Sequence, residues 1–241
     1  MAETTARYGQ VPPPFHQRED ALASIDLPPA AAPRGQQPLQ RVLARRTTCR
    51  SFDSARLLPL AALANVLDTV FGATDSKRLG KAYTVLRKHT PSAGALHPID
   101  AYPVVQGVSG LARGLYHYDA AHHRLALLEA MDASQASRFV AAALFGQRYW
   151  EHAHCVLLLV ARFDRTFWKY REHPKAYKAV LMDAGHLSQT LYLVCSALKL
   201  GAFVSAAIND GDIDARLTLD RTREGTVAAC GIGIPSAHDA R

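Results

Sequence analysis

The segment 175–200 constrains the fold more than any other part of the chain. Its apolar residues recur nearly all round a helix, and Gly201 follows directly after it. Glycine is common just past a helix C-terminus, so the pattern predicts one long helix over residues 175–200. Because a helix that is apolar on nearly every side needs protein around it, we expect this helix to be buried.

A second apolar run, Cys155–Phe163, is continuous and has the length of a strand. Such a run is typical of a central strand that is covered on both faces. Further strands are predicted at Ala101–Gln106, Gly114–Tyr118, Arg124–Leu128, Phe203–Ile208 and Thr226–Ile232. The second and third of these form a β-hairpin through Asp119–His123.

Shorter helices complete the pattern. Proline suits the first turn of a helix, so Pro38 and Pro59 mark two helix starts. The shorter helices are predicted over Leu39–Arg46, Pro59–Phe71, Ser134–Phe145 and Asp210–Leu217. Strands mixed with helices, including a hairpin, favour an α+β sandwich over a doubly wound sheet. We assign this domain to residues 38–241.

Residues 1–37 form a proline-rich arm in front of that domain. Proline fixes φ and removes an amide donor, so the arm should be extended rather than helical. Its apolar residues Phe15, Ile25 and Leu27 are suited to anchor it on a partner subunit. A disordered arm is the alternative.

The segment Asp75–Thr90 is basic and only weakly periodic. One interpretation is a mobile lid over a binding site. The simpler interpretation, which we prefer, is a solvated surface loop.

The charge is basic but dispersed. The 241-residue chain has a formal net charge of +7. No dense Lys/Arg tract stands out, so we do not expect nucleic-acid binding. No secretory signal is visible, and apolar stretches such as 155–161 are too short to cross a bilayer. We therefore expect a cytoplasmic protein that is not inserted in a membrane.

The four cysteines, at positions 49, 155, 195 and 230, form no C-x-x-C pair. Their spacing suits neither a metal site nor a disulfide scaffold, so we expect buried free thiols. The histidine pairs His122-His123 and His152-x-His154 are too isolated to indicate a metal. The sequence thus predicts no metal site.

The segment Arg45–Phe52 places guanidinium groups close together, with hydroxyl groups between them. Guanidinium is a fixed fork of donors that matches phosphate, and the hydroxyls of Thr47 and Thr48 add further donors. Arginine pairs at helix ends also occur simply because they favour the helix dipole, and that alternative stays open.

Three further segments contain residues suited to chemistry. Thr90–Pro98 holds small residues and a glycine, which let backbone approach a planar ligand, although an ordinary turn has the same composition. Lys169-Tyr170 pairs an ammonium with a phenol and so favours the phenolate, although aromatic packing at a surface helix end is the alternative. Gly185 lies inside the predicted long helix, where glycine costs about 1 kcal/mol relative to alanine and needs a packing reason.

The order of these motifs is more specific than any one of them, and it resembles the nitroreductase superfamily. More closely, it is similar to the SagB/McbC-type dehydrogenases, also called peptide maturation dehydrogenases, which are flavin subunits that modify ribosomally made peptides. The motifs in chain order are Arg-Arg-Thr-Thr-x-Arg-x-Phe from Arg45, Pro-Ser-Ala-Gly-Ala-Leu-His-Pro from Pro91, Gly-Leu-Tyr-His-Tyr-Asp from Gly114, Lys-Tyr-Arg from Lys169, Asp-Ala-Gly-His-x-x-Gln from Asp183 and Gly-x-Gly-x-Pro from Gly231. Asp100 departs from the pattern, since the family usually has Glu there.

The resemblance implies a role for each motif. Those implied to hold the FMN phosphate and part of the flavin are Arg46, Thr48 and Arg50. Those implied to line the flavin are Ser92, Ala93, Gly94, Ala95 and, more loosely, His97, with Gly231 and Gly233 nearby. Lys169 and Tyr170 are the implied catalytic pair. The implied dimer core beside the flavin contains Gly185, His186 and Gln189.

The resemblance therefore implies an α+β nitroreductase-like homodimer with a mixed or antiparallel sheet and two FMN sites at the subunit interface. The expected reaction is FMN-dependent oxidation of an azoline to an azole in a peptide substrate, with a cyclodehydratase as a possible partner. One alternative is a generic NAD(P)H-dependent nitro- or quinone reductase. Another is a flavin-binding scaffold subunit of a peptide-modifying complex.

Overall fold

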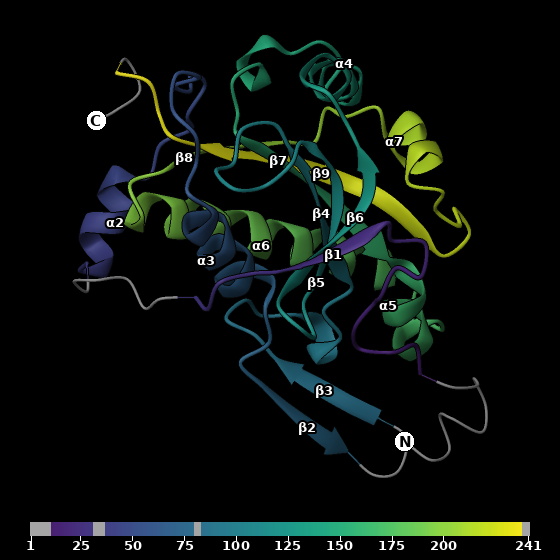
Figure 1. The fold of residues 1–241 in the computed structure, drawn as a ribbon. Coiled ribbons are helices and arrows are strands. Elements are labelled where there is room, and N and C mark those ends of the chain that lie inside the picture. Colours follow the sequence, from purple (N-terminus) through teal and green to yellow (C-terminus); the bar gives the residue numbers. More distant parts are fainter. Residues whose placement is uncertain (1–10, 31–36, 80–82, 238–241) are drawn as a thin grey trace.

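The computed structural model describes residues 11–30, 37–79 and 83–237 (Figure 1). The strands within these ranges are β1 (Ala23–Asp26), β2 (Asp75–Leu79), β3 (Tyr83–Arg87), β4 (Ile99–Val105), β5 (Gly114–Asp119), β6 (Arg124–Ala130), β7 (Cys155–Arg162), β8 (Gly201–Ser205) and β9 (Glu224–Gly233). The helices are α2 (Leu39–Arg45), α3 (Leu60–Phe71), α4 (Ala133–Ala143), α5 (Phe163–Tyr170), α6 (Ala176–Ala197) and α7 (Asp210–Arg216), with 3-10 turns at Ala93–Ala95 and Arg148–Trp150.

Within the described residues, one antiparallel sheet has the order β1-β6-β5-β4-β7-β9-β8, and β2 pairs only with β3. Helices cover both faces of the large sheet (Figure 1). This arrangement confirms the predicted α+β class.

Strand β7 is the centre of the core because both of its faces are covered. Every residue from Cys155 to Arg162 is buried. Leu157 and Leu159 pack in one cluster with α3 and α6, whereas Leu158 and Val160 pack in a second cluster with α4 and α7. At about 25 cal/mol per Å² of apolar surface, burial on two faces is the main stabilising contribution to such a strand. The predicted central strand is confirmed.

Helix α6 confirms the predicted long helix, but the expectation that it is buried on all sides is wrong for one face. Val180, Leu187 and Leu191 are buried against the sheet and α3. The outer face carries exposed large apolar side chains, which are Tyr177 (49% exposed), Leu181 (45%) and Met182 (62%). The apolar pattern therefore exceeds what one copy of the chain can cover.

The segment 75–90 is not the surface loop that its composition favoured. β2 and β3 pair in antiparallel register from Asp75 opposite Arg87 to Leu79 opposite Tyr83. The hairpin projects from the body of the molecule (Figure 1). The exposed side chains of the hairpin are basic, so the sequence lacks the apolar alternation that predicts a strand. The backbone groups of β2 and β3 nevertheless hydrogen-bond to each other, because this pairing does not depend on the side chains. Lys88 just beyond it donates to the Phe71 carbonyl oxygen at 2.6 Å.

The arm is extended where the structure describes it, as expected for residues 11–30, and lies on its own chain. β1 pairs with β6, from Ala23 opposite Leu127 to Asp26 opposite Arg124. Residues 1–10 and 31–36 of the predicted arm lie outside the described residues. For them, both disorder and contact with a partner subunit stay predictions.

Arg165 on α5 fixes the beginning of this arm. Its side chain is 1% exposed. Nε donates to the Leu96 carbonyl oxygen at 2.8 Å, and Nη1 donates to the carbonyl oxygens of Pro12, at 3.2 Å, and Pro13. Proline has no amide hydrogen to donate, so the backbone of the arm can take part here only as a hydrogen-bond acceptor, through its carbonyl oxygens. One buried guanidinium thus joins the arm to the segment that follows the Ala93–Ala95 turn.

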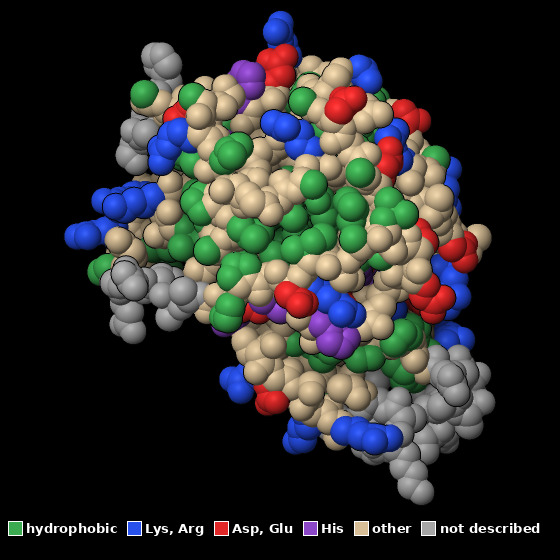
Figure 2. Space-filling model, in the orientation of Figure 1, with side chains coloured by type: hydrophobic (Ala, Val, Ile, Leu, Met, Phe, Trp, Pro, Cys, Tyr) green, Lys and Arg blue, Asp and Glu red, His purple; other side chains and the backbone are tan. Residues whose placement is uncertain are grey.

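The four cysteines are free and buried, as predicted. On the face drawn in Figure 2, hydrophobic side chains form a band across the middle, and Lys and Arg gather round the margin and on the projecting hairpin. Among the residues that the structure describes, no helix combines the length and the apolar character needed to cross a bilayer.

His97 lies between the projecting hairpin and the sheet. Its side chain is largely buried, and Nε2 lies 3.1 Å from the Leu86 carbonyl oxygen in β3. Burial lowers the pKa of His97 to about 4. The folded protein therefore keeps this imidazole neutral at pH values where the unfolded chain, with an ordinary pKa of about 6.5, is already protonated.

The substitution His97→Gln should make stability less sensitive to acid. Between pH 6.5 and pH 4 the unfolded wild type binds a proton that the folded state does not, so its unfolding free energy falls as the pH falls. Urea unfolding at pH 7 and pH 5 should show a drop that is about 1–2 kcal/mol smaller in His97→Gln than in wild type. His173→Gln, at an exposed position, is the control. An unchanged drop in His97→Gln would contradict the assignment.

Candidate functional site

Two of the predicted motifs meet at Gly94. A Cβ atom placed on Gly94 would lie 2.6 Å from Lys169 Nζ and 2.8 Å from the Tyr170 hydroxyl oxygen. Lys169 Nζ also lies 5.6 Å from the centre of the Tyr170 ring. The ammonium and the phenol therefore sit together against the backbone of the small-residue loop. Any side chain at Gly94 would occupy that space.

The loop from Ser92 to His97 has an unusual backbone. Gly94, Ala95 and His97 have positive φ values of 65°, 54° and 47°. Glycine adopts such values freely, but for other residues they are uncommon and cost on the order of 1 kcal/mol or more each. Surrounding contacts must hold the loop in this shape.

Asp183 on α6 provides those contacts. Its carboxylate accepts hydrogen bonds from Ser92 Oγ at 2.5 Å and from the Ala93 amide at 3.2 Å. Ser92 Oγ in turn accepts from the His97 amide at 2.9 Å. Burial raises the pKa of Asp183, and the two hydrogen bonds oppose that rise. Asp183 lay inside a predicted motif but had no predicted role of its own.

The phosphate-type motif lies against a different part of α6. The Thr48 hydroxyl is 3.1 Å from the Tyr192 hydroxyl, and the Arg46 guanidinium lies over the Tyr192 ring at 5.3 Å. Arg50 follows on the same segment and is exposed. Three predicted residues thus share one stretch of extended chain beside the C-terminal half of α6.

A pocket of about 310 Å³ opens next to this stretch. It contains two cationic side chains, Arg45 and Lys199, and two hydroxyls, Thr47 and Ser196. Arg45 and Thr47 belong to the predicted phosphate motif, whereas Ser196 and Lys199 were not predicted as ligands. The signal that identifies them is positional, because Tyr192, Ser196 and Lys199 fall at helical spacing on one side of α6 and its end. Cations with hydroxyls are the donors that a phosphate needs.

The Gly185 motif lies on the exposed face of α6. No atom lies within 4 Å of a Cβ placed on Gly185. Gln189 is exposed, and His186 Nδ1 lies 4.0 Å from the Asp183 carboxylate. Within one chain nothing requires a glycine at position 185, although glycine destabilises a helix interior.

Gly231 and Gly233 in β9 have packing reasons of their own. A Cβ on Gly231 would overlap the Phe203 ring, and one on Gly233 would overlap the His154 ring. Both glycines are buried in the sheet. Their place beside a flavin stays a prediction.

The predicted residues therefore form two separate groups along α6. The loop Ser92–Ala95 with Lys169 and Tyr170 is tied to Asp183, and the Arg46–Thr48 stretch is tied to Tyr192. At about 1.5 Å per residue, these anchor points are about 13 Å apart along the helix.

Comparisons with known proteins agree with this fold. The chain matches the model of the nitroreductase family over residues 43–234. It is 27% identical over 225 residues to the trifolitoxin-processing protein TfxB of Rhizobium leguminosarum bv. trifolii, covering 91% of this chain and 58% of that protein. It is 30% identical over 175 residues to MJ1384 of Methanocaldococcus jannaschii, which is named as a nitroreductase, covering 73% and 81% of the two chains.

Solved structures show the same fold. A nitroreductase-type structure from Anabaena variabilis superposes with a TM-score of 0.74 at 21% identity, covering 92% of this chain and 44% of that one. The Escherichia coli microcin synthetase complex McbBCD gives 0.65 at 20% identity, covering 88% and 78%. A Desulfovibrio desulfuricans structure with bound FMN gives 0.55 at 16% identity, covering 86% and 91%.

At these identities the structural likeness shows the fold alone. The match to the family model covers β2 to β9, helices on both faces of the sheet and both groups of candidate residues. This chain belongs to the nitroreductase family.

Proposed function

We propose that this protein is an FMN-dependent oxidoreductase that dehydrogenates a modified ribosomal peptide, converting an azoline ring to an azole. The observation that carries the proposal is the meeting of Lys169 Nζ and the Tyr170 hydroxyl at Gly94. Azoline oxidation removes a proton from a ring carbon together with a hydride. A phenol next to an ammonium suits the proton transfer, since the positive charge stabilises the phenolate.

The residues present fit FMN. When bound, FMN supplies hydride acceptance, a chemistry that side chains alone do not provide. Arg46, Thr48 and Arg50, together with Arg45 and Thr47, offer the cations and hydroxyls that a phosphate needs. Ser92–Ala95 offers a small-residue loop whose backbone a planar ring can approach.

In this scheme each of three residues, Tyr170, Lys169 and Asp183, has a defined task. Tyr170, as the phenolate, accepts the proton from the ring carbon and becomes the neutral phenol, and the Lys169 ammonium stabilises the phenolate before the transfer. Asp183 holds the loop that carries Gly94 in its strained shape. Positioning of this kind lowers the entropic part of the barrier, because the reacting groups are already in place.

Two copies of the chain are needed to complete a site in this scheme. The Asp183 end and the Tyr192 end of α6 carry complementary groups about 13 Å apart. If two α6 helices cross antiparallel near their midpoints, the loop of one copy faces the arginine segment of the other. The exposed Leu181 and Met182 and the open space at Gly185 suit such a close helix contact. We therefore propose a homodimer with two FMN sites at its interface.

Two relatives support a peptide substrate. TfxB is a trifolitoxin-processing protein, and the McbBCD structure is a microcin synthetase complex with a truncated pro-peptide bound. We propose that this chain likewise acts on a peptide and works beside a cyclodehydratase that forms the azoline. MJ1384 favours a second candidate function, an NAD(P)H-dependent nitro- or quinone reductase. Rapid NADPH oxidation with a nitroaromatic acceptor and no peptide would favour that candidate.

The substitution Tyr170→Phe should abolish azole formation and leave FMN binding unchanged. It removes the oxygen that, as the phenolate, takes the proton, but it keeps the ring packing. The test compares the absorption spectrum of the purified protein, the mass of the released flavin, and the mass of an azoline-bearing peptide, which falls by two hydrogens on oxidation.

A loss of about a hundredfold or more in turnover is expected, as for removal of a general base. Tyr177→Phe on α6 is the control, because Tyr177 is exposed and outside the Gly94 cluster. Full activity in Tyr170→Phe would mean that this hydroxyl is not the base. A wild type that binds no FMN at all would overturn the proposed function.

The substitution Met182→Glu should separate the dimer. It places a charge on the outer face of α6, where desolvating an unpaired carboxylate is unfavourable. Analytical ultracentrifugation should show a dimer for wild type and a monomer with reduced FMN content for the variant. Phe145→Glu is the matched control, since Phe145 is 66% exposed and Met182 is 62% exposed. A monomeric wild type with full FMN content would contradict the shared site.

The substitution Asp183→Ala should weaken FMN binding about tenfold or more. It leaves the half-buried Ala93 amide and Ser92 hydroxyl without their acceptor, which costs about 1–3 kcal/mol and frees the loop. Quenching of FMN fluorescence on titration gives the dissociation constant. Asp212→Ala on α7 is an exposed-site control. Unchanged FMN affinity would show that Asp183 has no positioning role.

A further inference from the structure

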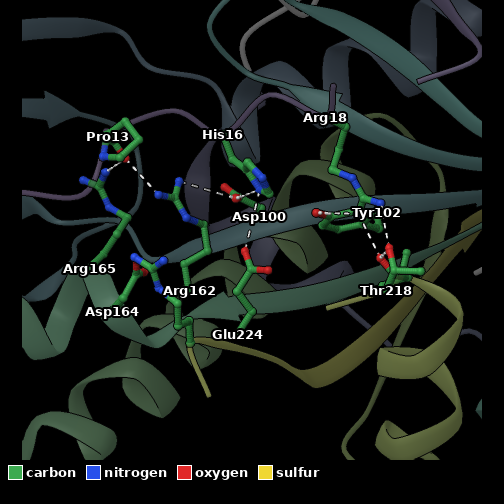
Figure 3. A network of polar contacts seen from close by, with 12 residues as sticks. Pro13, His16, Arg18, Asp100, Tyr102, Arg162, Asp164, Arg165, Thr218 and Glu224 are labelled. Atoms are coloured by element: carbon green, nitrogen blue, oxygen red, sulfur yellow. Dashed lines mark hydrogen bonds and ion pairs between the residues drawn. The ribbon is translucent and has the colours of Figure 1, made fainter. Parts of the chain in front are cut away.

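A second polar cluster lies away from the candidate flavin residues, on the face of the sheet opposite α6. Its strand residues are Asp100 on β4, His117 on β5 and Glu224 on β9. The arm covers them and adds His16 from above (Figure 3). The cluster is thus built from three strands and a segment distant in the sequence.

The arm is held firmly where it crosses this cluster. Arg162 Nη2 donates to the Pro13 carbonyl oxygen at 3.1 Å, and Arg18 Nη1 donates to the Leu217 carbonyl oxygen at 3.1 Å (Figure 3). These bonds flank His16 on both sides in the sequence. The position of the His16 ring over the strands is therefore determined by the fold.

Three side chains in the cluster have the arrangement of a metal site. One ligand atom from each of His16, Asp100 and His117 lies within 4.8 Å of the other two. His16 Nδ1 is 3.6 Å from Asp100 Oδ2 and 3.8 Å from Glu224 Oε1. Ligands bound tetrahedrally at about 2.0–2.2 Å lie about 3.3–3.6 Å from one another, so a small contraction brings these atoms to coordination distance.

The polar atoms that converge here have no hydrogen-bond partners. Both ring nitrogens of His117 are buried and unpaired, and so are His16 Nδ1 and Asp100 Oδ2. The whole His117 residue is 1% exposed. Buried polar atoms are nearly always paired, because an unpaired one costs about 1–3 kcal/mol. One ligand atom from each of these three side chains lies within 4.8 Å of the other two, so an ion between them would give the unpaired atoms a partner.

Two carboxylates, those of Asp100 and Glu224, supply negative charge at this space. The guanidinium of Arg162, whose Nη1 lies 3.8 Å from Asp100 Oδ2, and the buried ammonium of Lys88 also interact with Asp100. Imidazole nitrogens act as metal ligands in their neutral form. Two imidazoles and one or two carboxylates, with no thiolate, form a donor set that suits Zn²⁺.

We propose that His16, Asp100 and His117 bind one Zn²⁺ ion, with Glu224 close enough to complete the coordination. This ion fastens the arm to β4 and β5. Its role is structural, because the site lies under the arm on the face of the sheet opposite α6, whereas the Gly94 loop is held by Asp183 on α6. The inference is independent of the proposed flavin chemistry.

The test uses the full-length chain after treatment with a chelator and its removal. Equilibrium dialysis against Zn²⁺ alone, with metal measured by mass spectrometry, should give one zinc per wild-type chain. The variants His16→Gln and His117→Phe should each bind zinc more than about tenfold more weakly, since each loses one ligand. His173→Gln changes an exposed histidine outside the cluster and should bind as wild type does.

Thermal unfolding provides a second measurement. A ligand that binds only the folded state raises the unfolding temperature, so Zn²⁺ should stabilise wild type and His173→Gln but neither ligand variant. FMN content should stay the same throughout, which separates failure of the zinc site from failure of the flavin proposal.

Two results would overturn the proposal. One is a wild type that takes up no stoichiometric zinc. The other is zinc binding that persists unchanged in the ligand variants. If His117→Phe does not fold, the result for His16→Gln decides, because that side chain belongs to the arm and lies outside the core clusters.

Discussion

The double-sided burial of β7 is the constraint on which the rest of the structure depends. Because alternate residues of this strand enter two different apolar clusters, helices must cover both faces of the sheet. α6 is the helix that covers one of them, and both groups of candidate residues are attached to it. β7 therefore positions the candidate residues indirectly, because α6, which holds them, packs against it.

Attachment to α6 also explains why the candidate residues fall into two groups. Asp183 shapes the loop at one part of the helix, and Tyr192 receives the arginine segment at another. A helix is rigid over this length, so neither group can move towards the other within one chain. The exposed apolar side of the same helix, with a glycine that no intrachain contact requires, is the surface through which the proposed dimer would bring the two groups together.

Much of the fold was predictable, because long apolar runs such as Cys155–Phe163 have few possible structures. The β2–β3 hairpin was not, since basic residues such as Lys77 and Arg78 conceal a strand that backbone pairing stabilises. In the site, the motif order identified Ser92–Ala95 and Lys169-Tyr170, and the structure places them side by side. Asp183 and the pocket residues Ser196 and Lys199 were missed, because their roles come from contacts between segments far apart in the sequence. The same reason hides the cluster of His16, Asp100 and His117.

Hydrogen bonds from the buried Arg165 stabilise the attachment of the N-terminal arm to the rest of the molecule. Its guanidinium is satisfied on one side by Leu96 and on the other by the carbonyl groups of Pro12 and Pro13. If the arm detached, this buried charge would lose the carbonyl groups of Pro12 and Pro13, and leaving a buried charge without such partners is unfavourable. Lys169 and Tyr170 lie on that same helix. Pro12 and Pro13 are therefore part of what holds α5 in place, so losing them would disturb the helix that carries Lys169 and Tyr170.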